Sequence, residues 1–287
     1  MSEITLMASA KINIGLDVTG RRDDGYHLVR TIMQTIGLND VVTVATSHEP
    51  GIVMTTNDET LPVGEDNLCV KAAKLLMDEF HITEGVKIHL EKRIPVAAGL
   101  AGGSTDAAAV LTGVNHVFQL DLTEEQLMER AVNIGADVPY CLLGGTALAE
   151  GIGQELKRLP RMMDCFVLIA KPPIEVSTKY VYEHFDGLKN PTHPDIDAMV
   201  ADIENRDLHS LASHMGNILE GVTVEKYPVI DQIKREMMEH GAVVSMMSGS
   251  GPTVFGFFED ETLVQEAKSV LETSGLVNRV EVTSIVK

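Results

Sequence analysis

Near its start the chain alternates apolar and polar residues with a period of two. Isoleucine, leucine and valine occupy every second position from 12 to 18, and Lys11, Asn13, Gly15 and Asp17 lie between them. A strand with one buried face has this pattern, so Lys11 and Asn13 are predicted to share the face opposite the apolar one. Residues 8–11, which are three small residues and Lys11, separate this run from the apolar residues at 4 and 6. The sequence therefore predicts a strand pair or one long strand over residues 4–18.

The rest of the chain predicts an antiparallel start followed by helices, which favours the α+β class. Two strands at 31–36 and 41–46 are predicted to be joined by a turn at 37–40. Asn67 and Thr123 each precede a helical pattern as N-caps. The later strands and helices suggest a small ferredoxin-like domain. We place a domain junction near Arg158, giving domains at residues 1–158 and 159–287.

Composition narrows the choice of partner. The chain has 287 residues, with 23 lysines and arginines against 42 aspartates and glutamates, so its formal net charge is −19. A nucleic-acid partner would require a basic surface, so we expect none. No apolar run is long enough to span a bilayer, so no membrane partner is expected either. Three scattered cysteines and the lack of a signal-like start predict a cytoplasmic protein.

A glycine-rich stretch at residues 95–109 holds the first candidate chemistry. Gly99, Gly102 and Gly103 lead into Ser104 and Thr105 and then into an alanine-rich helical pattern. Glycine amides at a helix N-terminus can bind phosphate, because the backbone comes close and the helix dipole favours an anion. The alternative is an ordinary turn whose serine or threonine caps the helix. A Walker A loop is excluded because Ser104 stands where that motif needs lysine, so the cation must come from elsewhere.

Lys11 and Asp137 are candidates to complete such a site. Asp137 lies among small residues, directly before Val138 and Pro139, where a surface role is hard to explain. An aspartate can accept a hydroxyl proton, and a lysine beside it keeps the carboxylate ionised and stabilises developing negative charge. A surface lysine on an edge strand remains the alternative for Lys11.

Four stretches, in this order, resemble motifs of the GHMP kinase superfamily. They are Ser9-Ala10-Lys11-Ile12-Asn13, the glycine-rich stretch at 95–109, Gly135-Ala136-Asp137-Val138-Pro139, and the second glycine turn at 247–253. The resemblance implies a two-domain fold, with an N-terminal domain like domain 2 of ribosomal protein S5 and a ferredoxin-like C-terminal domain. It also implies that ATP and Mg²⁺ are used.

The same resemblance assigns roles to individual residues. It makes Lys11 and Asp137 the catalytic pair and Ser104 a Mg²⁺ contact through ATP. The ATP phosphates would be bound by Pro95, Val96, Ala97, Ala98, Gly99, Leu100, Ala101, Gly102, Gly103, Ser104 and Thr105. The acceptor substrate would be bound by Asn13, Tyr26, His27, Tyr182, Gly249, Ser250 and Gly251. Tyr180 competes with Tyr182 for the position that stacks on the substrate.

Within the superfamily, Lys11 to Asn13 followed by Asp24-Gly25-Tyr26-His27 is similar to kinases of the non-mevalonate isoprenoid pathway. This implies phosphorylation of a hydroxyl on a cytidine diphosphate-linked sugar alcohol, by a monomer or homodimer. Two alternatives stay open. One is a kinase for another small alcohol, such as mevalonate or homoserine. The other is a nucleotide-binding relative without catalysis.

Overall fold

The structure, a computed structural model, describes residues 2–286 and divides into two compact units that interleave along the chain. Unit 1 comprises Met1–Ala10, Leu38–Val96 and Ala101–Gly144. Unit 2 comprises Lys11–Gly37, Ala97–Leu100 and Gly145–Lys287. The units divide the chain differently from a boundary after residue 158, which stays a prediction.

Two long strands pass from one unit to the other. Strand β1 spans Glu3–Arg21 and pairs with β2, which spans His27–Ser47. Of the two alternatives for residues 4–18, the single long strand is confirmed. Ala8 and Ala10 are buried like Ile12 and Ile14, so the inward-facing period of two runs through the small residues without a break.

The predicted turn at residues 37–40 is wrong, because β2 continues through it. Position 37 is a glycine because another chain segment comes close to it, and not because the backbone turns there. A Cβ on this residue would lie 2.9 Å from Thr283 Oγ1, so a larger side chain would collide with the neighbouring strand end. A glycine within an extended strand marks such a close approach as readily as a turn.

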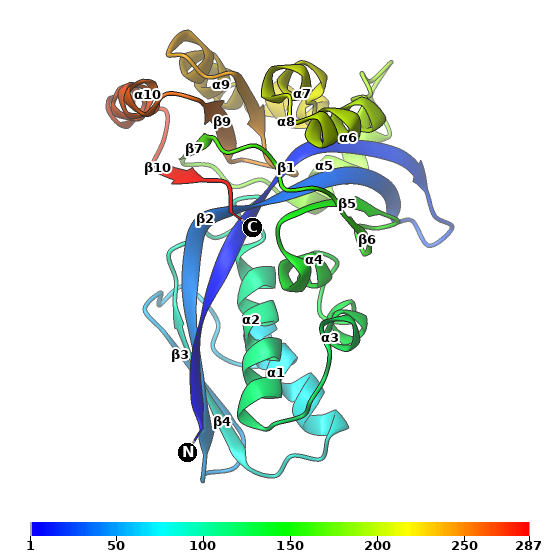
Figure 1. Ribbon diagram of the computed structural model, residues 1–287, viewed down its shortest axis with the longest axis vertical. Helices are drawn as coiled ribbons and strands as arrows, with labels where there is room; N and C mark the ends of the chain where they lie inside the picture. The colour runs from blue at the N-terminus through cyan, green and yellow to red at the C-terminus, as the bar shows by residue number, and fades with distance from the viewer. Residues whose placement is uncertain (1, 287) are drawn as a thin grey trace. The chain divides into compact units, whose positions relative to one another are not determined.

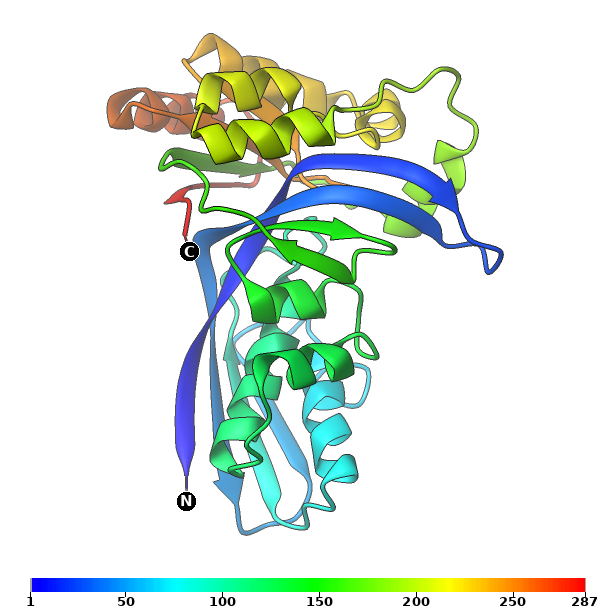
Figure 2. The same cartoon turned by 45° about the vertical axis from the view of Figure 1, so that its right-hand side comes forward.

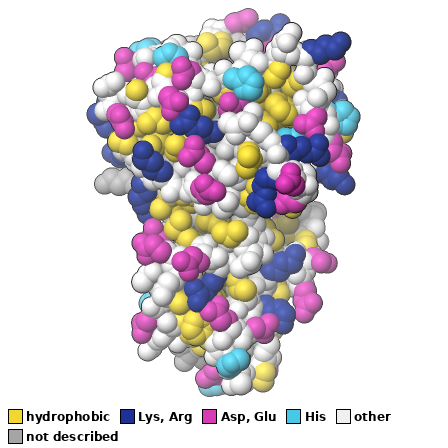
Figure 3. Space-filling view, turned by 90° about the vertical axis from the view of Figure 1, so that its right-hand side faces the viewer, with side chains coloured by type: hydrophobic (Ala, Val, Ile, Leu, Met, Phe, Trp, Pro, Cys, Tyr) yellow, Lys and Arg dark blue, Asp and Glu magenta, His cyan; other side chains and the backbone are white. Residues whose placement is uncertain are grey.

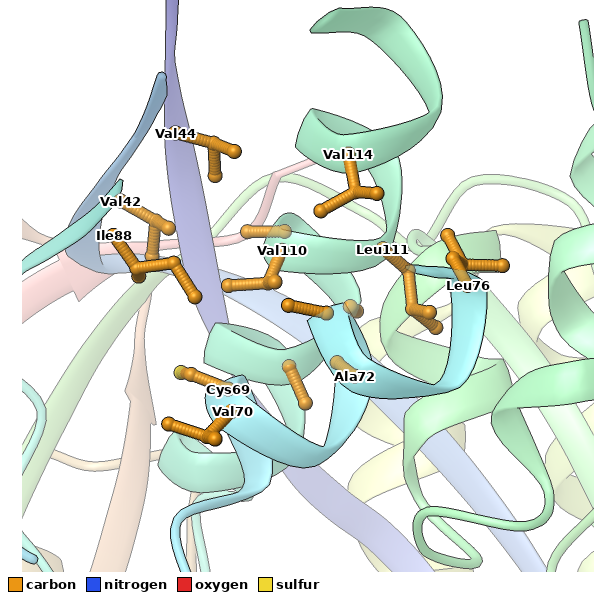
Figure 4. Close-up of a cluster of buried hydrophobic side chains, with 14 of the residues drawn as sticks. Val42, Val44, Cys69, Val70, Ala72, Leu76, Ile88, Val110, Leu111 and Val114 are labelled. Atoms are coloured by element: carbon orange, nitrogen blue, oxygen red, sulfur yellow. The ribbon is translucent and has the colours of Figure 1, made fainter. Parts of the chain in front are cut away.

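Unit 1 packs helices against one part of the main sheet (Figure 1). Strand β4 pairs antiparallel with β2 over residues 41–47 and parallel with β3. The elements that lie wholly in this unit are β3 (Ile52–Thr56), α1 (Leu68–Glu79), β4 (Gly85–Glu91), α2 (Gly102–Val117), α3 (Glu124–Ala131) and α4 (Val138–Leu143). Valine, isoleucine and leucine of the sheet meet α1 and α2 in a buried cluster (Figure 4).

Local sequence signals explain where the helices of unit 1 begin. The Asn67 side chain accepts a hydrogen bond from Cys69 N at 2.8 Å and caps α1, as predicted. Thr123 and Gln126 form the predicted capping box of α3. Helix α3 ends at Ala131, four residues before Gly135. These caps satisfy backbone amides that have no partner within the helix.

Unit 2 contains a four-stranded antiparallel sheet in the order β10-β7-β9-β8 (Figures 1 and 2). The chain order from β7 through α9, β8, β9, α10 and β10 gives the β-α-β-β-α-β pattern of a ferredoxin-like fold. Its strands are β7 (Phe166–Lys171), β8 (Val244–Met247), β9 (Val254–Phe258) and β10 (Arg279–Ser284), and its helices are α9 (Val229–Glu239) and α10 (Glu261–Thr273). The predicted α+β class and ferredoxin-like second domain are confirmed.

Unit 2 also contains strands and helices outside this four-stranded sheet and its two helices. Strand β5 pairs with β2 over Thr31–Gln34 and with β6 on its other side. The remaining elements are β5 (Thr146–Glu150), β6 (Glu155–Arg158), α5 (Thr178–Phe185), α6 (Ile196–Asn205), α7 (Leu208–His214) and α8 (Glu220–Lys226). Among the helices of residues 2–286, none is long and apolar enough to cross a membrane. Acidic, basic and apolar side chains are interspersed on the face drawn in Figure 3.

Substitution of Gly113 tests how closely α2 packs on the sheet. A Cβ at this position would lie 2.6 Å from Val44 Cγ2, so we expect Gly113→Ala to force the helix away. Overpacking costs about 1–3 kcal/mol, and alanine's better helix propensity returns about 1 kcal/mol. The free energy of unfolding, measured by denaturant titration, should therefore fall by up to about 2 kcal/mol.

Gly103 provides the matched control in the same helix. A Cβ there would meet only Leu68 Cδ1, at an ordinary 3.6 Å. Gly103→Ala should therefore leave the free energy of unfolding unchanged or slightly higher. Equal stability of the two variants would contradict the close packing of α2 on Val44.

Candidate functional site

Lys11 and Asn13 lie side by side on β1 and are both buried. Lys11 Nζ donates to Asn13 Oδ1 at 2.6 Å, and Asn13 Nδ2 donates to Thr31 Oγ1 at 2.9 Å. Thr31 in turn donates to the backbone oxygen of Gly15 at 2.6 Å. This confirms the shared face predicted from the period of two. The alternative of a surface lysine is wrong, because Lys11 is only 5% exposed.

Ser248 joins this strand to both glycine-rich segments within unit 2. Its hydroxyl accepts a hydrogen bond from Asn13 N at 3.3 Å and donates to the backbone oxygen of Gly99 at 2.9 Å. Lys11 N donates to the backbone oxygen of Leu100 at 3.1 Å. The sequence motifs around residues 11, 99 and 248 thus meet at one place, although they lie far apart in the chain.

The two glycine segments pack backbone against backbone. A Cβ on Gly99, which has φ +74°, would lie 2.3 Å from the backbone oxygen of Ser248. A Cβ on Gly249, which has φ +57°, would lie 3.3 Å from Asn13 Oδ1. Both positions combine a left-handed backbone with close contact, and glycine alone suits this combination.

Side chains from neighbouring elements hold the second glycine turn. Asn217 Nδ2 donates to the backbone oxygens of Met247 and Gly249, at 2.9 and 2.7 Å. The hydroxyls of Ser250 and Thr178 lie 2.8 Å apart and share a hydrogen bond. The turn that includes Gly249, Ser250 and Gly251 is therefore fixed in place before any ligand binds.

The first glycine segment leads into α2 without a side-chain cap. Ala101 is the N-cap residue, in a left-handed conformation with φ +55°, and makes no side-chain hydrogen bond to the helix. Ser104 and Thr105 lie inside the first turn, so the alternative of a serine or threonine cap is wrong. The first-turn amides carry partial positive charge that a bound anion can satisfy.

The loop itself crosses between the units. Pro95 and Val96 belong to unit 1, residues 97–100 to unit 2, and the chain from Ala101 to unit 1 again. Ala97 also has a positive φ of 50°, an unfavourable conformation for a residue with a Cβ. The surrounding structure thus holds the loop in a shape that its alanines do not prefer.

Asp137 is the N-cap residue of the short helix α4, which has Pro139 in its first turn. Its side chain makes no capping hydrogen bond to that helix. The residue is half-buried and lies in unit 1, whereas Lys11 lies in unit 2. The pairing of Asp137 with Lys11 therefore stays a prediction.

A second group of predicted residues gathers around His27. The rings of His27 and Tyr182 lie with their centroids 5.1 Å apart and their planes at 31°. Tyr180 instead stacks on His184 at 3.8 Å, with Lys226 Nζ 3.4 Å from its ring centroid. Of the two competing tyrosines, Tyr182 is therefore the one beside His27. Tyr26 is 64% exposed.

Asp186 completes this group and was missed in the sequence. Its Oδ1 lies 2.9 Å from His27 Nε2, and its Oδ2 accepts from Arg21 Nη1 at 2.9 Å. The hydrogen bond from His27 and the charges of His27 and Arg21 hold the pKa of Asp186 below its usual value. Asp186 comes directly after α5, 159 residues from His27, and no local pattern links the two.

A Mg²⁺ site made by the protein alone would need a cluster of side chains that bind metal. Within residues 2–286, no group of three or more His, Cys, Asp or Glu side chains could hold a metal ion. A Mg²⁺ carried by nucleotide phosphates needs only one or two protein oxygens. The Ser104 hydroxyl, half-buried in the first turn of α2, fits this requirement.

Ser248→Ala tests the junction between β1 and the glycine loop. Ser248 is fully buried, so the variant leaves Asn13 N and the Gly99 oxygen without their partner. Lost hydrogen bonds of buried groups cost about 1–3 kcal/mol, which should appear in the free energy of unfolding. The control is Ser245→Ala, another buried serine, whose hydroxyl is bonded within residues 2–286 only to Met237 Sδ, at 3.3 Å. Equal effects of the two variants would refute the junction.

Comparison with known proteins shows the family and the fold of the chain. A family model described as the GHMP kinases N terminal domain matches residues 67–145, and one for the GHMP kinases C terminal matches residues 199–276. The crystal structure of a 4-(cytidine 5'-diphospho)-2C-methyl-D-erythritol kinase has a TM-score of 0.84 and 30% identity, covering 99% of this chain and 100% of the other. A homoserine kinase from Cytophaga hutchinsonii has a TM-score of 0.80 at 21% identity, which shows the fold alone.

Two relatives are similar over most of their length. A 4-diphosphocytidyl-2-C-methyl-D-erythritol kinase from Lachnospira eligens is 52% identical over 99% of this chain and 98% of its own. A kinase of the same name from Caldicellulosiruptor bescii is 50% identical over 88% of each chain. The chain therefore belongs to the GHMP kinase superfamily, in the family of 4-diphosphocytidyl-2-C-methyl-D-erythritol kinases.

Proposed function

We propose that the protein transfers the γ-phosphoryl group of ATP to the 2-hydroxyl of 4-diphosphocytidyl-2-C-methyl-D-erythritol, in non-mevalonate isoprenoid precursor biosynthesis. The observation that carries the proposal is the packing of His27 on Tyr182, with Asp186 bonded to the imidazole. An aromatic face beside an oriented hydrogen-bonding ring suits a nucleobase. A kinase for a small alcohol without a base has no use for it.

Cytosine recognition follows from the hydrogen bonds of His27. The ionised Asp186 can only accept, so a neutral His27 donates through Nε2 and keeps Nδ1 as an acceptor. An acceptor at Nδ1 matches the exocyclic amino group of cytosine. Tyr182 would stack on the base from one side and Tyr26, which is exposed, from the other.

The catalytic step would use Lys11 and Asp137. Asp137 takes the proton of the substrate's 2-hydroxyl while the hydroxyl oxygen attacks the γ-phosphorus of ATP. The bond between the γ-phosphorus and the β–γ bridging oxygen breaks, and ADP is released. The ammonium of Lys11 stabilises the negative charge that develops on the attacking oxygen. Asn13 Oδ1, 2.6 Å from Lys11 Nζ, orients that ammonium.

The ATP phosphates would be bound by residues 95–105, through loop amides and the uncapped first turn of α2. Mg²⁺ would be held by the phosphates with Ser104 and would neutralise their charge. Gly249, Ser250 and Gly251 would form a second wall beside the acceptor substrate. We further propose a cytoplasmic enzyme, acting as a monomer or homodimer, with neither a nucleic-acid nor a membrane partner.

An ADP-release assay tests the substrate. ADP should form with ATP and 4-diphosphocytidyl-2-C-methyl-D-erythritol and not with mevalonate or homoserine. Asp137→Asn should lower kcat by at least about 10²-fold while circular dichroism stays unchanged, since it removes the proposed base and keeps the size. Turnover with mevalonate alone would overturn the proposal. ATP binding without turnover of any alcohol would favour a non-catalytic relative.

His27→Ala tests base recognition separately from catalysis. Losing an oriented hydrogen bond and an aromatic contact costs about 2–3 kcal/mol, so KM for the cytidyl substrate should rise about 30–150-fold. The KM for ATP should stay the same. Tyr180→Phe is the matched control, since its ring stacks on His184 rather than His27, and it should leave both constants unchanged. An unchanged KM for the cytidyl substrate in His27→Ala would refute the role of His27.

A further inference from the structure

A buried cluster of charges in unit 1 has no part in the chemistry described so far. Lys92 Nζ lies 2.5 Å from Asp40 Oδ2 and 2.7 Å from Asp106 Oδ2. The three side chains are 0–5% exposed. Charges buried this completely are expensive to desolvate, and apolar residues of the same size often give equal stability. Their presence therefore requires a reason other than stability.

The cluster connects the two ends of the glycine loop. Asp40 Oδ1 accepts hydrogen bonds from the backbone amides of Arg93 and Ile94, at 2.5 and 2.7 Å, directly before Pro95. Asp106 lies in α2, directly after Thr105. Lys92 bonds to both carboxylates. A single ammonium therefore connects the segment directly before the loop to the first turns of α2 directly after it.

Gly102 shows how closely the loop exit is held against this ammonium. A Cβ at Gly102 would lie 2.9 Å from Lys92 Nζ and 3.1 Å from Ile94 Cγ2. The glycine thus lets the first turn of α2 close on the cluster. Like Gly99, this glycine has a packing reason that is independent of any phosphate.

We propose that Asp40, Lys92 and Asp106 are positioning residues that hold the two ends of residues 95–105 and so set the affinity for ATP. The proposal rests on the nucleotide-binding role given to this loop above. A loop whose ends are fixed loses little conformational entropy when it closes on phosphate. Without the ammonium, the two carboxylates would repel each other, and the ends would separate.

Lys92 stays charged in this buried setting. Burial lowers its pKa, but the carboxylates of Asp106 and Asp40 outweigh burial and raise it. The ammonium that connects the two ends of the loop is therefore present at neutral pH.

The test is nucleotide binding, measured calorimetrically with ADP and Mg²⁺ at neutral pH. Lys92→Met keeps the length of the stem and removes the charge, and its Kd should rise at least about tenfold. Lys74→Met is the matched control, since Lys74 forms an exposed pair with Asp78 on α1, and its Kd should equal that of the wild type. Tight binding by a folded Lys92→Met would overturn the proposal.

Asp106→Ala keeps the test decisive if Lys92→Met does not fold. It removes the bond from Lys92 to α2 and leaves the bond to Asp40, so its Kd should also rise above that of the wild type. A Kd equal to that of the wild type in a folded Asp106→Ala would refute the role of Asp106. Failure of the wild type to bind ADP at all would instead refute the proposed function.

Discussion

The hydroxyl of Ser248 is the contact on which the arrangement of unit 2 depends. It accepts from Asn13 N on β1 and donates to the Gly99 oxygen, so one atom joins segments that lie 235 and 149 residues away. Lys11 N adds a bond to the Leu100 oxygen. Because Gly99 and Gly249 have no side chains, the two backbones reach contact distance. The position of the buried Lys11 beside the loop follows from this packing.

Local periodicity predicted the parts of the site that lie on one element. The period of two placed Lys11 and Asn13 on one face, and the caps at Asn67 and Thr123 located two helices. Long-range pairing was beyond such signals. Nothing near Asp186 points to His27, and nothing near Lys92 points to Asp40, because these contacts depend on the tertiary fold. Their residue types are equally common on solvated surfaces.

The errors in strand prediction have a related cause. Small residues at 8–11 and Gly37 have the composition of turns, yet both segments are extended. Ala8 and Ala10 keep the inward parity of β1, and Gly37 makes room for Thr283. Composition cannot distinguish a turn from a close approach, because both favour residues with little or no side chain. In both long strands, these small residues lie beside the points where the chain passes between units.

The location of positive charge near the loop bears on how an acidic protein could hold a polyanion. Lys92 precedes the glycine loop by three residues, but its ammonium is bonded to Asp40 and Asp106 and is almost fully buried. Its charge is therefore largely neutralised before any phosphate arrives. The ammonium of Lys11 donates a hydrogen bond to the amide oxygen of Asn13 on the same strand. In the proposed function, anion affinity in the loop depends on backbone amides and the first turn of α2, whose geometry Lys92 is proposed to hold. In the roles proposed for them, Lys92 shapes the binding loop and Lys11 acts on the reacting groups.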